Sequence, residues 1–217
     1  MKTVYFVRHG QSEGNVGSVF QHADSPLTAK GIKQAEFIAE RCTRLPIDVI
    51  ISSTQPRAAD TAQIISENTK HEVEFSDLFR ERKKPRSLEG KFHNDAEARK
   101  INEAWWNSLA GSGPRVEDGE SFDDLRDRAG KALAFLSNRA EDNLLVVTHG
   151  FFLRYLVASA IFGEHMQSIQ FQPLMRTLRT ENTGVTVLRY DSPRFSEEIG
   201  PHVPWVLVTW NDHAHLG

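Results

Sequence analysis

Apolar runs with β character alternate along this chain with segments of helical periodicity, and this alternation strongly restricts the folds open to it. Residues 4–7 and 144–148 are short apolar runs, typical of buried strands, whereas residues 27–42 place apolar side chains at helical spacing. Tandem units of this kind predict an α/β fold, a three-layer sandwich with a mainly parallel central sheet and helices on both faces. We expect strands at 4–7, 47–52, 144–148, 184–190 and 204–210, and helices at 27–42, 58–68, 121–139 and 151–162.

The length and composition predict a single domain over 1–217. With 217 residues, 39% of them hydrophobic, the chain is long enough for one substantial core. Its net charge of -3 gives no overall positive field, so nucleic acid is not expected as a partner. A membrane is not expected either, because no segment approaches the roughly 18 apolar residues that span a bilayer. The single cysteine, Cys42, favours a reducing compartment, and we expect a cytoplasmic protein.

Polar side chains gather where the predicted strands end. Arg8 and His9 follow the first strand, Arg57 follows the second, Glu81 follows a short apolar stretch, and His149 follows residues 144–148. The carboxyl ends of parallel strands meet at one edge of a sheet, so these side chains are expected to converge. Arginine suits phosphate, histidine can act as a nucleophile or a donor, and a carboxylate can move protons. The set predicts phosphoryl transfer with no metal ion and no cofactor.

Five short motifs also occur in a fixed order along the chain. They are RHGQSEGN at 8–15, LTAKG with QA at 27–35, SSTQPRA with TA at 52–62, VTHG at 147–150, and NTGV at 182–185. An RHG tripeptide by itself recurs by chance, whereas five motifs in order are specific. Through them the chain resembles, nearly end to end, the histidine phosphatase superfamily, also called the phosphoglycerate mutase-like family.

The resemblance implies roles for most of the polar residues. His9 would be the nucleophile and would carry the phosphoryl group as a phosphohistidine. Arg8, Arg57 and His149 would bind the equatorial phosphate oxygens, where charge develops in the transition state. Asn15 would add a neutral donor to the same phosphate-binding set. The predicted activity is that of a phosphatase acting on phosphate monoesters.

A carboxylate is also implied, as the group that protonates the leaving oxygen and then activates water. Glu81 is the first candidate. The family usually has a Glu-Gly pair soon after this glutamate, whereas here the run RKKPRSL separates Glu81 from Glu89 and Gly90. Glu89 therefore remains an alternative proton carrier.

Several other functions remain open at this stage. A mutase shares the phosphohistidine step, although the region 80–93 lacks the tyrosine and glycine-rich segment of the glycolytic mutases. A phosphate-binding regulatory module without turnover is a second alternative. A third is a serine hydrolase using Ser12 and His149, because GQSEG at 10–14 matches the GxSxG pattern. Ser53 is interpreted as an ordinary loop residue.

Two groups of charged residues add further hypotheses. Asp212, His213 and His215, with Glu164-His165 elsewhere, could be imagined as metal ligands, but no closed ligand set is visible. Residues 80–91 are rich in Lys and Arg, and residues 116–127 are rich in Asp and Glu.

The segment 79–119 lacks strand character and is expected to form a small cap over the site. Within it, Lys83, Lys84 and Arg86 would favour substrates with charge beyond the transferred phosphate. The expected partner is a phosphorylated small molecule, with a phosphoprotein as a second possibility. The oligomeric state is left open.

Overall fold

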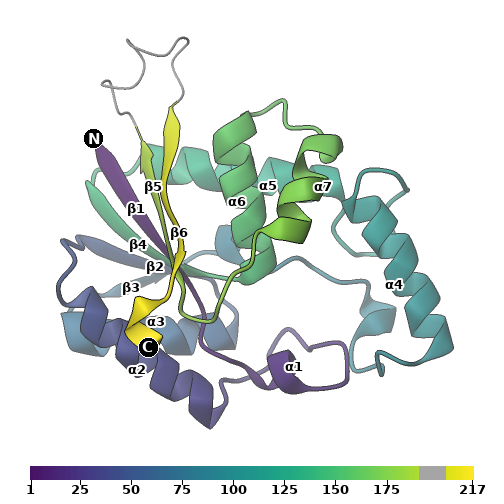
Figure 1. The fold of residues 1–217 in the computed structure, drawn as a ribbon, viewed down its shortest axis with the longest axis horizontal. Coiled ribbons are helices and arrows are strands. Elements are labelled where there is room, and N and C mark those ends of the chain that lie inside the picture. The colour runs from purple at the N-terminus through teal and green to yellow at the C-terminus, as the bar shows by residue number, and fades with distance from the viewer. Residues whose placement is uncertain (191–203) are drawn as a thin grey trace.

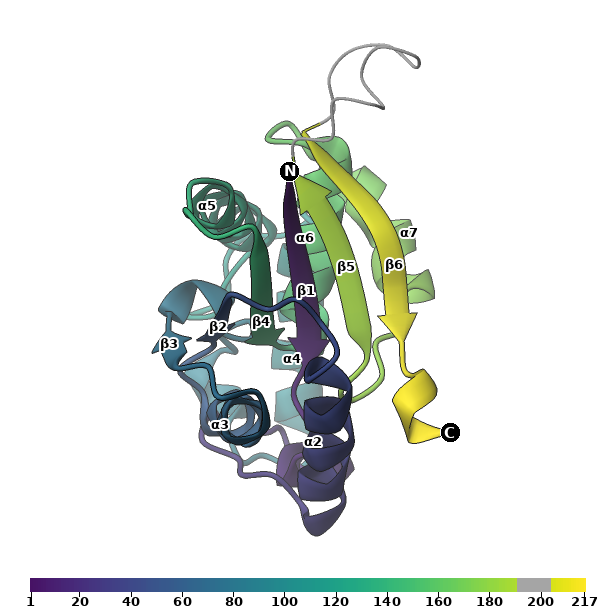
Figure 2. The same ribbon diagram turned by 90° about the vertical axis from the view of Figure 1, so that its left-hand side faces the viewer.

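A computed structural model describes residues 1–190 and 204–217, and its centre is a six-stranded sheet (Figure 1). The strands are β1 (Lys2–Arg8), β2 (Val49–Ser52), β3 (Val73–Phe75), β4 (Asn143–Thr148), β5 (Val185–Tyr190) and β6 (Trp205–Asp212). Their order is β3-β2-β4-β1-β5-β6, which Figure 2 shows from one edge to the other. The first four are parallel, β5 is antiparallel to β1, and β6 is antiparallel to β5. The predicted mainly parallel sheet is confirmed.

Helices cover both faces of this sheet. They are α1 (Glu13–Val16), α2 (Ala29–Cys42), α3 (Pro56–Thr69), α4 (Ala96–Leu109), α5 (Phe122–Ser137), α6 (Gly150–Phe162) and α7 (Ser168–Thr177). Successive side chains of a strand point to opposite faces. Val7 accordingly packs in the core under α2 and α3, whereas Phe6 packs in the core under α5 and α6. In Figure 1 the first pair of helices lies apart from the second, which confirms the three-layer sandwich.

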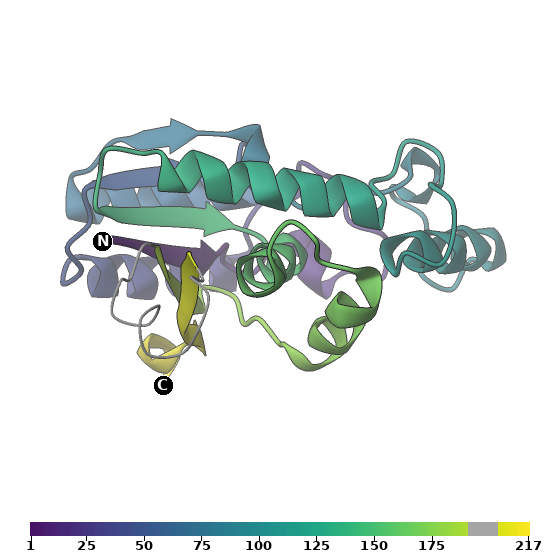
Figure 3. The same ribbon diagram turned by 90° about the horizontal axis from the view of Figure 1, so that it is seen from above.

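Three helices, α1, α4 and α7, and the strand β3 are absent from the sequence-based prediction. α4 begins at Asp95, whose side chain accepts a hydrogen bond from the Ala98 N–H at 2.8 Å. Its buried residues Ala98, Trp105 and Leu109 lie on one helical face. α7 contains Pro173, a residue that normally interrupts a helical pattern. Figure 3 shows α4 extending away from the sheet, so the segment 79–119 contains regular structure that projects from the three layers.

The N-terminus of α6 lies at the middle of the sheet's carboxyl edge. The helix follows β4 directly, and His149 is its N-cap residue. Most of α6 is apolar and buried, which fixes its first turn against the sheet. Even so, among residues 1–190 and 204–217 no helix is both long and apolar enough to cross a membrane.

Candidate active site

Three adjacent parallel strands bring the two central histidines together. β1 and β2 flank β4, and the register aligns Arg8 with Thr148 and Ser52 with Val147. The residues that follow are therefore side by side at the carboxyl edge, as the sequence predicts. The rings of His9 and His149 have their centroids 4.9 Å apart. Both side chains are almost completely buried, with exposed fractions of 2% and 0%.

Two glycines allow the loop after β1 to pack tightly against α2. A Cβ atom on Gly10 would lie 2.4 Å from the Gly31 carbonyl oxygen, and a Cβ on Gly31 would lie 2.0 Å from the Gln11 carbonyl oxygen. Neither position can therefore hold a larger residue without a backbone shift. Thr28 caps α2 by accepting the Gly31 N–H at 3.0 Å, which fixes the start of the helix beside the loop. This packing sets the position of His9.

His9 is held as a neutral imidazole with one defined reactive nitrogen. Its Nδ1 lies 2.6 Å from the Gly10 carbonyl oxygen, an acceptor, so Nδ1 carries the proton. Nε2 is then unprotonated, and it accepts a hydrogen bond from Arg57 Nε at 3.3 Å. Burial, together with Arg57 and Arg8, holds the pKa of His9 well below its usual value. The Nε2 lone pair is thus available to a nucleophilic reaction near neutral pH.

Two arginines lie close to His9, and both act to lower the pKa of its ring. Arg57, from the first turn of α3, donates to the Ala23 carbonyl oxygen at 2.9 Å and to Gln55 Oε1 at 3.2 Å. Arg8 donates from Nη1 to the Thr180 carbonyl oxygen, and its buried Nε has no partner within the described chain. Burial lowers the pKa of Arg57 to about 10, so the group still carries its charge at neutral pH. Two charged guanidinium groups so close together are chemically suited to binding an anion.

The two ring nitrogens of His149 differ in their surroundings. Its Nε2 lies 2.8 Å from the Ser53 hydroxyl, while the buried Nδ1 has no hydrogen-bond partner in the part of the chain that the structure describes. Burial, Arg57 and His9 hold the pKa of His149 well below its usual value. The interpretation of Ser53 as an ordinary loop residue is therefore wrong, because Ser53 orients a histidine of the site.

Glu81 has its carboxylate at the N-terminus of α6. Oε2 accepts the Phe151 N–H at 3.2 Å, and Oε1 accepts the N–H groups of Phe152 and Arg82 at 3.1 and 2.9 Å. The backbone N–H of Glu81 donates at 2.9 Å to Gln55 Oε1, the oxygen that also binds Arg57.

The alternative carboxylate lies elsewhere. Glu89 is exposed at the end of a short 3₁₀-helix, Arg86–Leu88, and does not line the cavity that contains Glu81. Of the two glutamates, Glu81 is the one that lies near the site's arginines, since its carboxylate acts to raise the pKa of both Arg8 and Arg57.

Asn15 lies at the mouth of the site, on α1. Its Oδ1 accepts the Ser12 N–H at 3.0 Å and the Asn182 side-chain amide at 3.3 Å, so its amide nitrogen remains to donate to a ligand. Asn182 in turn donates to the His9 carbonyl oxygen at 2.8 Å. Asn182 and Gln55 are therefore site residues that the sequence analysis does not assign. Both lie inside the quoted motifs, which was the available signal.

The serine hydrolase alternative requires Ser12 and His149 to lie together. The Ser12 hydroxyl is buried and accepts a hydrogen bond from Gln21 at 2.9 Å, whereas His149 pairs with Ser53. The structure thus does not bring Ser12 and His149 together.

Two of the residues considered as metal ligands, Asp212 and His215, have partners within the protein. Asp212 forms an ion pair with Arg41 at 2.5 Å, and His215 lies 3.0 Å from the Thr183 hydroxyl. Within residues 1–190 and 204–217, no three His, Cys, Asp or Glu side chains are placed to hold a metal ion.

A cavity of about 380 Å³ opens beside Glu81. The segment 79–119 lines one side of it and residues 14–21 line the other. Its lining includes Arg82, Lys84 and Arg99, with Glu81 as its one carboxylate among the described residues. The Arg82 guanidinium lies 3.6 Å from the Phe151 ring centroid, and its buried Nη1 has no partner in the described chain. Burial and Arg82 lower the pKa of Lys84 to about 8.

The other cations of this stretch have a different environment. Lys83 forms an ion pair with Asp118 at 3.0 Å, and Arg86 lies 3.8 Å from the same carboxylate. Of the three residues expected to face the substrate, only Lys84 lines the cavity. The other two, Lys83 and Arg86, share Asp118 of the acidic stretch 116–127 as their partner. The structure therefore corrects the assignment of Lys83 and Arg86.

Comparisons with known proteins give one consistent result. The model of the histidine phosphatase superfamily (branch 1) matches residues 4–198. The probable phosphoglycerate mutase GpmB of Proteus mirabilis is 34% identical over 224 residues, which cover 100% of this chain and 95% of the relative.

Solved structures agree with the sequence comparisons. YhfR of Bacillus stearothermophilus superposes with a TM-score of 0.81 at 26% identity, covering 100% of both chains. A mycobacterial glucosyl-3-phosphoglycerate phosphatase superposes with a TM-score of 0.77 at 26% identity, covering 98% of this chain and 99% of its own.

Proposed function

Because the chain belongs to the histidine phosphatase superfamily, we propose that it hydrolyses phosphate monoesters through a phosphohistidine intermediate on His9. The observation that carries this proposal is the state of the His9 ring. Nδ1 is hydrogen-bonded to the Gly10 carbonyl oxygen, and Nε2 accepts a hydrogen bond from Arg57, while the charge of Arg8 also acts on the ring. This leaves a neutral nucleophile with a fixed direction next to groups that bind an anion.

In the first step, the Nε2 lone pair of His9 attacks phosphorus as the bond to the ester oxygen breaks. Protonated Glu81 gives its proton to the leaving oxygen, so the product alcohol departs neutral. Arg8, Arg57 and His149 compensate the charge on the three equatorial oxygens. Asn15 contributes its amide nitrogen to the same oxygens. We therefore expect the reaction to proceed without a metal ion.

In the second step, the Glu81 carboxylate takes a proton from water as the water oxygen attacks phosphorus. The P–N bond breaks, its electron pair returns to His9 Nε2, and inorganic phosphate leaves. Glu81 is then protonated and ready for the next turnover. Gln55 supports both steps, since its one side-chain oxygen binds the Glu81 backbone and the Arg57 guanidinium.

The cavity beside Glu81 supports a more specific substrate class. The leaving group must extend from phosphorus on the side of its proton donor, which is the side where Arg82, Lys84 and Arg99 lie. These cations favour a leaving group that carries a second negative charge. In this proposal the segment 79–119 is the cap that selects the substrate.

A mutase is the second candidate, because relatives of this chain bear the name probable phosphoglycerate mutase. A mutase must return the phosphoryl group to its substrate and exclude water. The region 80–93 lacks the tyrosine and glycine-rich segment typical of the glycolytic mutases, so we favour the phosphatase. The two are distinguished by incubating the protein with phosphoglycerate and measuring both the isomer and the free phosphate.

The central test is the hydrolysis of para-nitrophenyl phosphate in EDTA by wild type, His9→Ala and Ser12→Ala. We expect turnover by the wild type and by Ser12→Ala, and a loss of at least about 10³-fold for His9→Ala. Denaturation of the working enzyme at alkaline pH, where the P–N bond is stable, should trap phosphate on histidine. An active His9→Ala variant would refute the phosphohistidine, and an inactive wild type would favour the binding-module alternative.

A further inference from the structure

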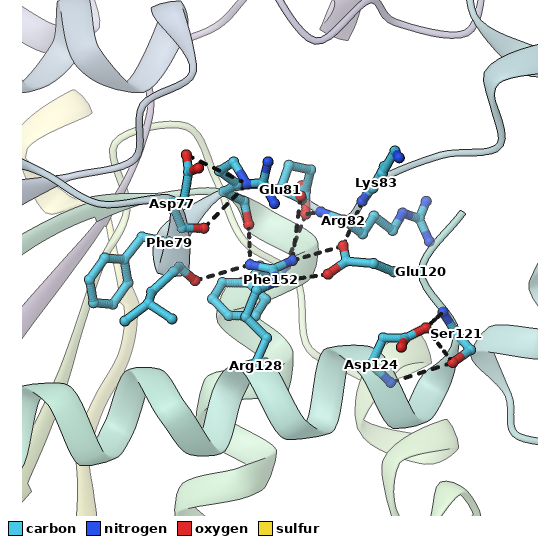
Figure 4. Close-up of polar contacts among 12 residues, drawn as sticks. Asp77, Phe79, Glu81, Arg82, Lys83, Glu120, Ser121, Asp124, Arg128 and Phe152 are labelled. Atoms are coloured by element: carbon cyan, nitrogen blue, oxygen red, sulfur yellow. Dashed lines mark hydrogen bonds and ion pairs between the residues drawn. The ribbon is translucent and has the colours of Figure 1, made fainter. Parts of the chain in front are cut away.

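Arg128, on α5, lies under the segment that carries Glu81 (Figure 4). Its Nη1 donates to the carbonyl oxygens of Leu78 and Arg80 at 3.0 and 2.8 Å. Nε and Nη2 donate to the two carboxylate oxygens of Glu120 at 2.8 and 3.0 Å, and Nη2 also reaches the Glu81 carbonyl oxygen at 3.5 Å. All five guanidinium N–H groups therefore have acceptors, an arrangement that only arginine can provide.

Glu120 binds the same short segment, and we call Arg128 and Glu120 together the bracket. Its Oε2 accepts the Lys83 N–H at 2.7 Å, while Arg128 holds carbonyl groups just before that residue. The Arg128 guanidinium also lies 3.8 Å from the ring centroid of Phe152. The backbone N–H of Phe152 is one of the donors to the Glu81 carboxylate. Arg128 thus contacts both the backbone that carries Glu81 and a residue that binds its side chain.

The bracket matters because residues 80–85 belong to no helix or strand. The backbone N–H groups of Glu81 and Lys83 bind side chains instead, those of Gln55 and Glu120. The Arg128 and Glu120 side chains are themselves only 11% and 16% exposed, which keeps the pair rigid. The position of the Glu81 carboxylate therefore depends on these side-chain contacts.

We infer that Arg128 and Glu120 form a positioning pair that holds Glu81 at the distance required for proton transfer to the leaving oxygen. A proton carrier must lie within hydrogen-bond reach of its target, so a small shift of this segment weakens proton transfer selectively. The inference rests on the proposed function, in which Glu81 is the proton carrier. Neither Arg128 nor Glu120 touches the reacting atoms in this scheme.

The test compares two substrates that need the proton to different degrees. para-Nitrophenyl phosphate releases an acidic phenol, which leaves without protonation, whereas β-glycerol phosphate releases an alcohol, which needs a proton. The variants are Arg128→Lys and Glu120→Gln. The matched control is Arg126→Lys, on the same helix, whose guanidinium pairs with Asp123 and Asp127. Thermal unfolding of each variant accompanies the kinetics, and if Arg128→Lys does not fold, Glu120→Gln decides alone.

We expect kcat/KM, which reports the first step alone, to fall about 10²-fold for β-glycerol phosphate in Arg128→Lys and Glu120→Gln, and less than about tenfold for para-nitrophenyl phosphate. The control should match wild type on both substrates. Equal losses on the two substrates would show a general structural effect and overturn the inference, and so would wild-type kinetics.

Glu81→Gln separates this inference from the proposed function. If Glu81→Gln shows no selective loss on the alkyl ester, Glu81 is not the proton carrier, and the positioning role fails with it, whereas hydrolysis through His9 is tested separately by His9→Ala. If Glu81→Gln shows that loss and the Arg128 and Glu120 variants do not, only the positioning role fails. In the double variant Glu81→Gln/Arg128→Lys, Arg128→Lys should add no further difference between the two substrates.

Discussion

At the scale of single residues, the site depends on polar contacts that fix the direction of each ring. Ser53 is the simplest example, because one hydroxyl binds Nε2 of His149 and leaves the buried Nδ1 without a partner in the described chain. We expect Ser53→Ala to lower kcat about tenfold, since it leaves a buried ring nitrogen without a partner. Steady-state kinetics on para-nitrophenyl phosphate measure this.

The matched control is Ser52→Ala. That hydroxyl is equally buried but bonds the Ser53 carbonyl oxygen at 3.0 Å rather than a ring. Ser52→Ala should destabilise the protein to a similar extent and retain most of the activity. The same activity loss in both variants would argue against a role for Ser53 in orienting His149.

The sequence identifies the charged residues of the site more readily than the neutral ones. His9, Arg8, Arg57 and His149 follow strands that lie side by side, so their convergence was predictable from topology alone. Ser53, Gln55 and Asn182 act through partners distant in the sequence, and single polar residues in loops are common. The choice between Glu81 and Glu89 likewise required the path of a segment with no regular structure.

At the scale of elements, the close contact between α2 and the loop after β1 requires glycine at position 31. Gly31→Ala would place a Cβ atom 2.0 Å from the Gln11 carbonyl oxygen and push the helix from the loop that holds His9. We expect a loss of about 1–3 kcal/mol in the free energy of unfolding, together with reduced kcat. Urea denaturation and steady-state kinetics measure the two effects.

Gly130 offers the opposite case within a helix. A Cβ atom there would meet no atom within 4 Å, and the residue lies inside α5. Gly130→Ala should therefore stabilise the protein by about 0.5–1 kcal/mol with kcat unchanged. If Gly31→Ala proved as harmless as Gly130→Ala, the proposed packing of α2 on the loop would be wrong.

Helices and strands were predicted correctly where apolar residues recur regularly, and they were missed where polar residues or a proline interrupt that pattern. The five predicted strands, β1, β2, β4, β5 and β6, and helices α2, α3, α5 and α6 have continuous apolar faces or runs, whereas the short edge strand β3 does not. α4 is largely polar outside Ala98, Trp105 and Leu109, and α7 contains Pro173. Both helices are stabilised mainly by tertiary packing, which a local pattern does not reveal.

At the scale of the whole molecule, the buried histidines make stability depend on pH. The folded-state pKa values of His9 and His149 lie below the value of about 6.5 expected in the unfolded chain. The unfolded state therefore takes up more protons as the pH falls. Stability is complete above about pH 6.5 and decreases as the pH falls from there toward the folded-state values.

Each histidine that stays neutral at pH 5 should cost about 2 kcal/mol in the free energy of unfolding relative to pH 7. Urea denaturation at the two pH values measures the difference. His9→Ala should reduce the dependence by about half. A wild-type stability that does not change between pH 7 and pH 5 would contradict the neutral, buried state of both rings.

The cavity between the three-layer body and the segment 79–119 predicts a substrate preference. Lys84→Met and Arg99→Met should each raise KM for phosphoglycerate about tenfold, because one charge contact is lost, and leave KM for para-nitrophenyl phosphate nearly unchanged. Arg86→Met is the control, since Arg86 faces Asp118 outside the cavity. Equal changes in KM for both substrates would argue against a second anion subsite.

The order of the strands also has a consequence for how the protein is made. β1 precedes its partners by most of the chain, since Val4 pairs with Leu144 on one side and with Leu188 on the other. Pairings this distant in sequence slow folding, and at about 5–20 residues per second the ribosome adds the partners many seconds after β1. His9 therefore emerges early but gains His149 and Asn182 late. A nascent chain would therefore become active only after β4 and β5 have paired with β1, the strand that is synthesised first.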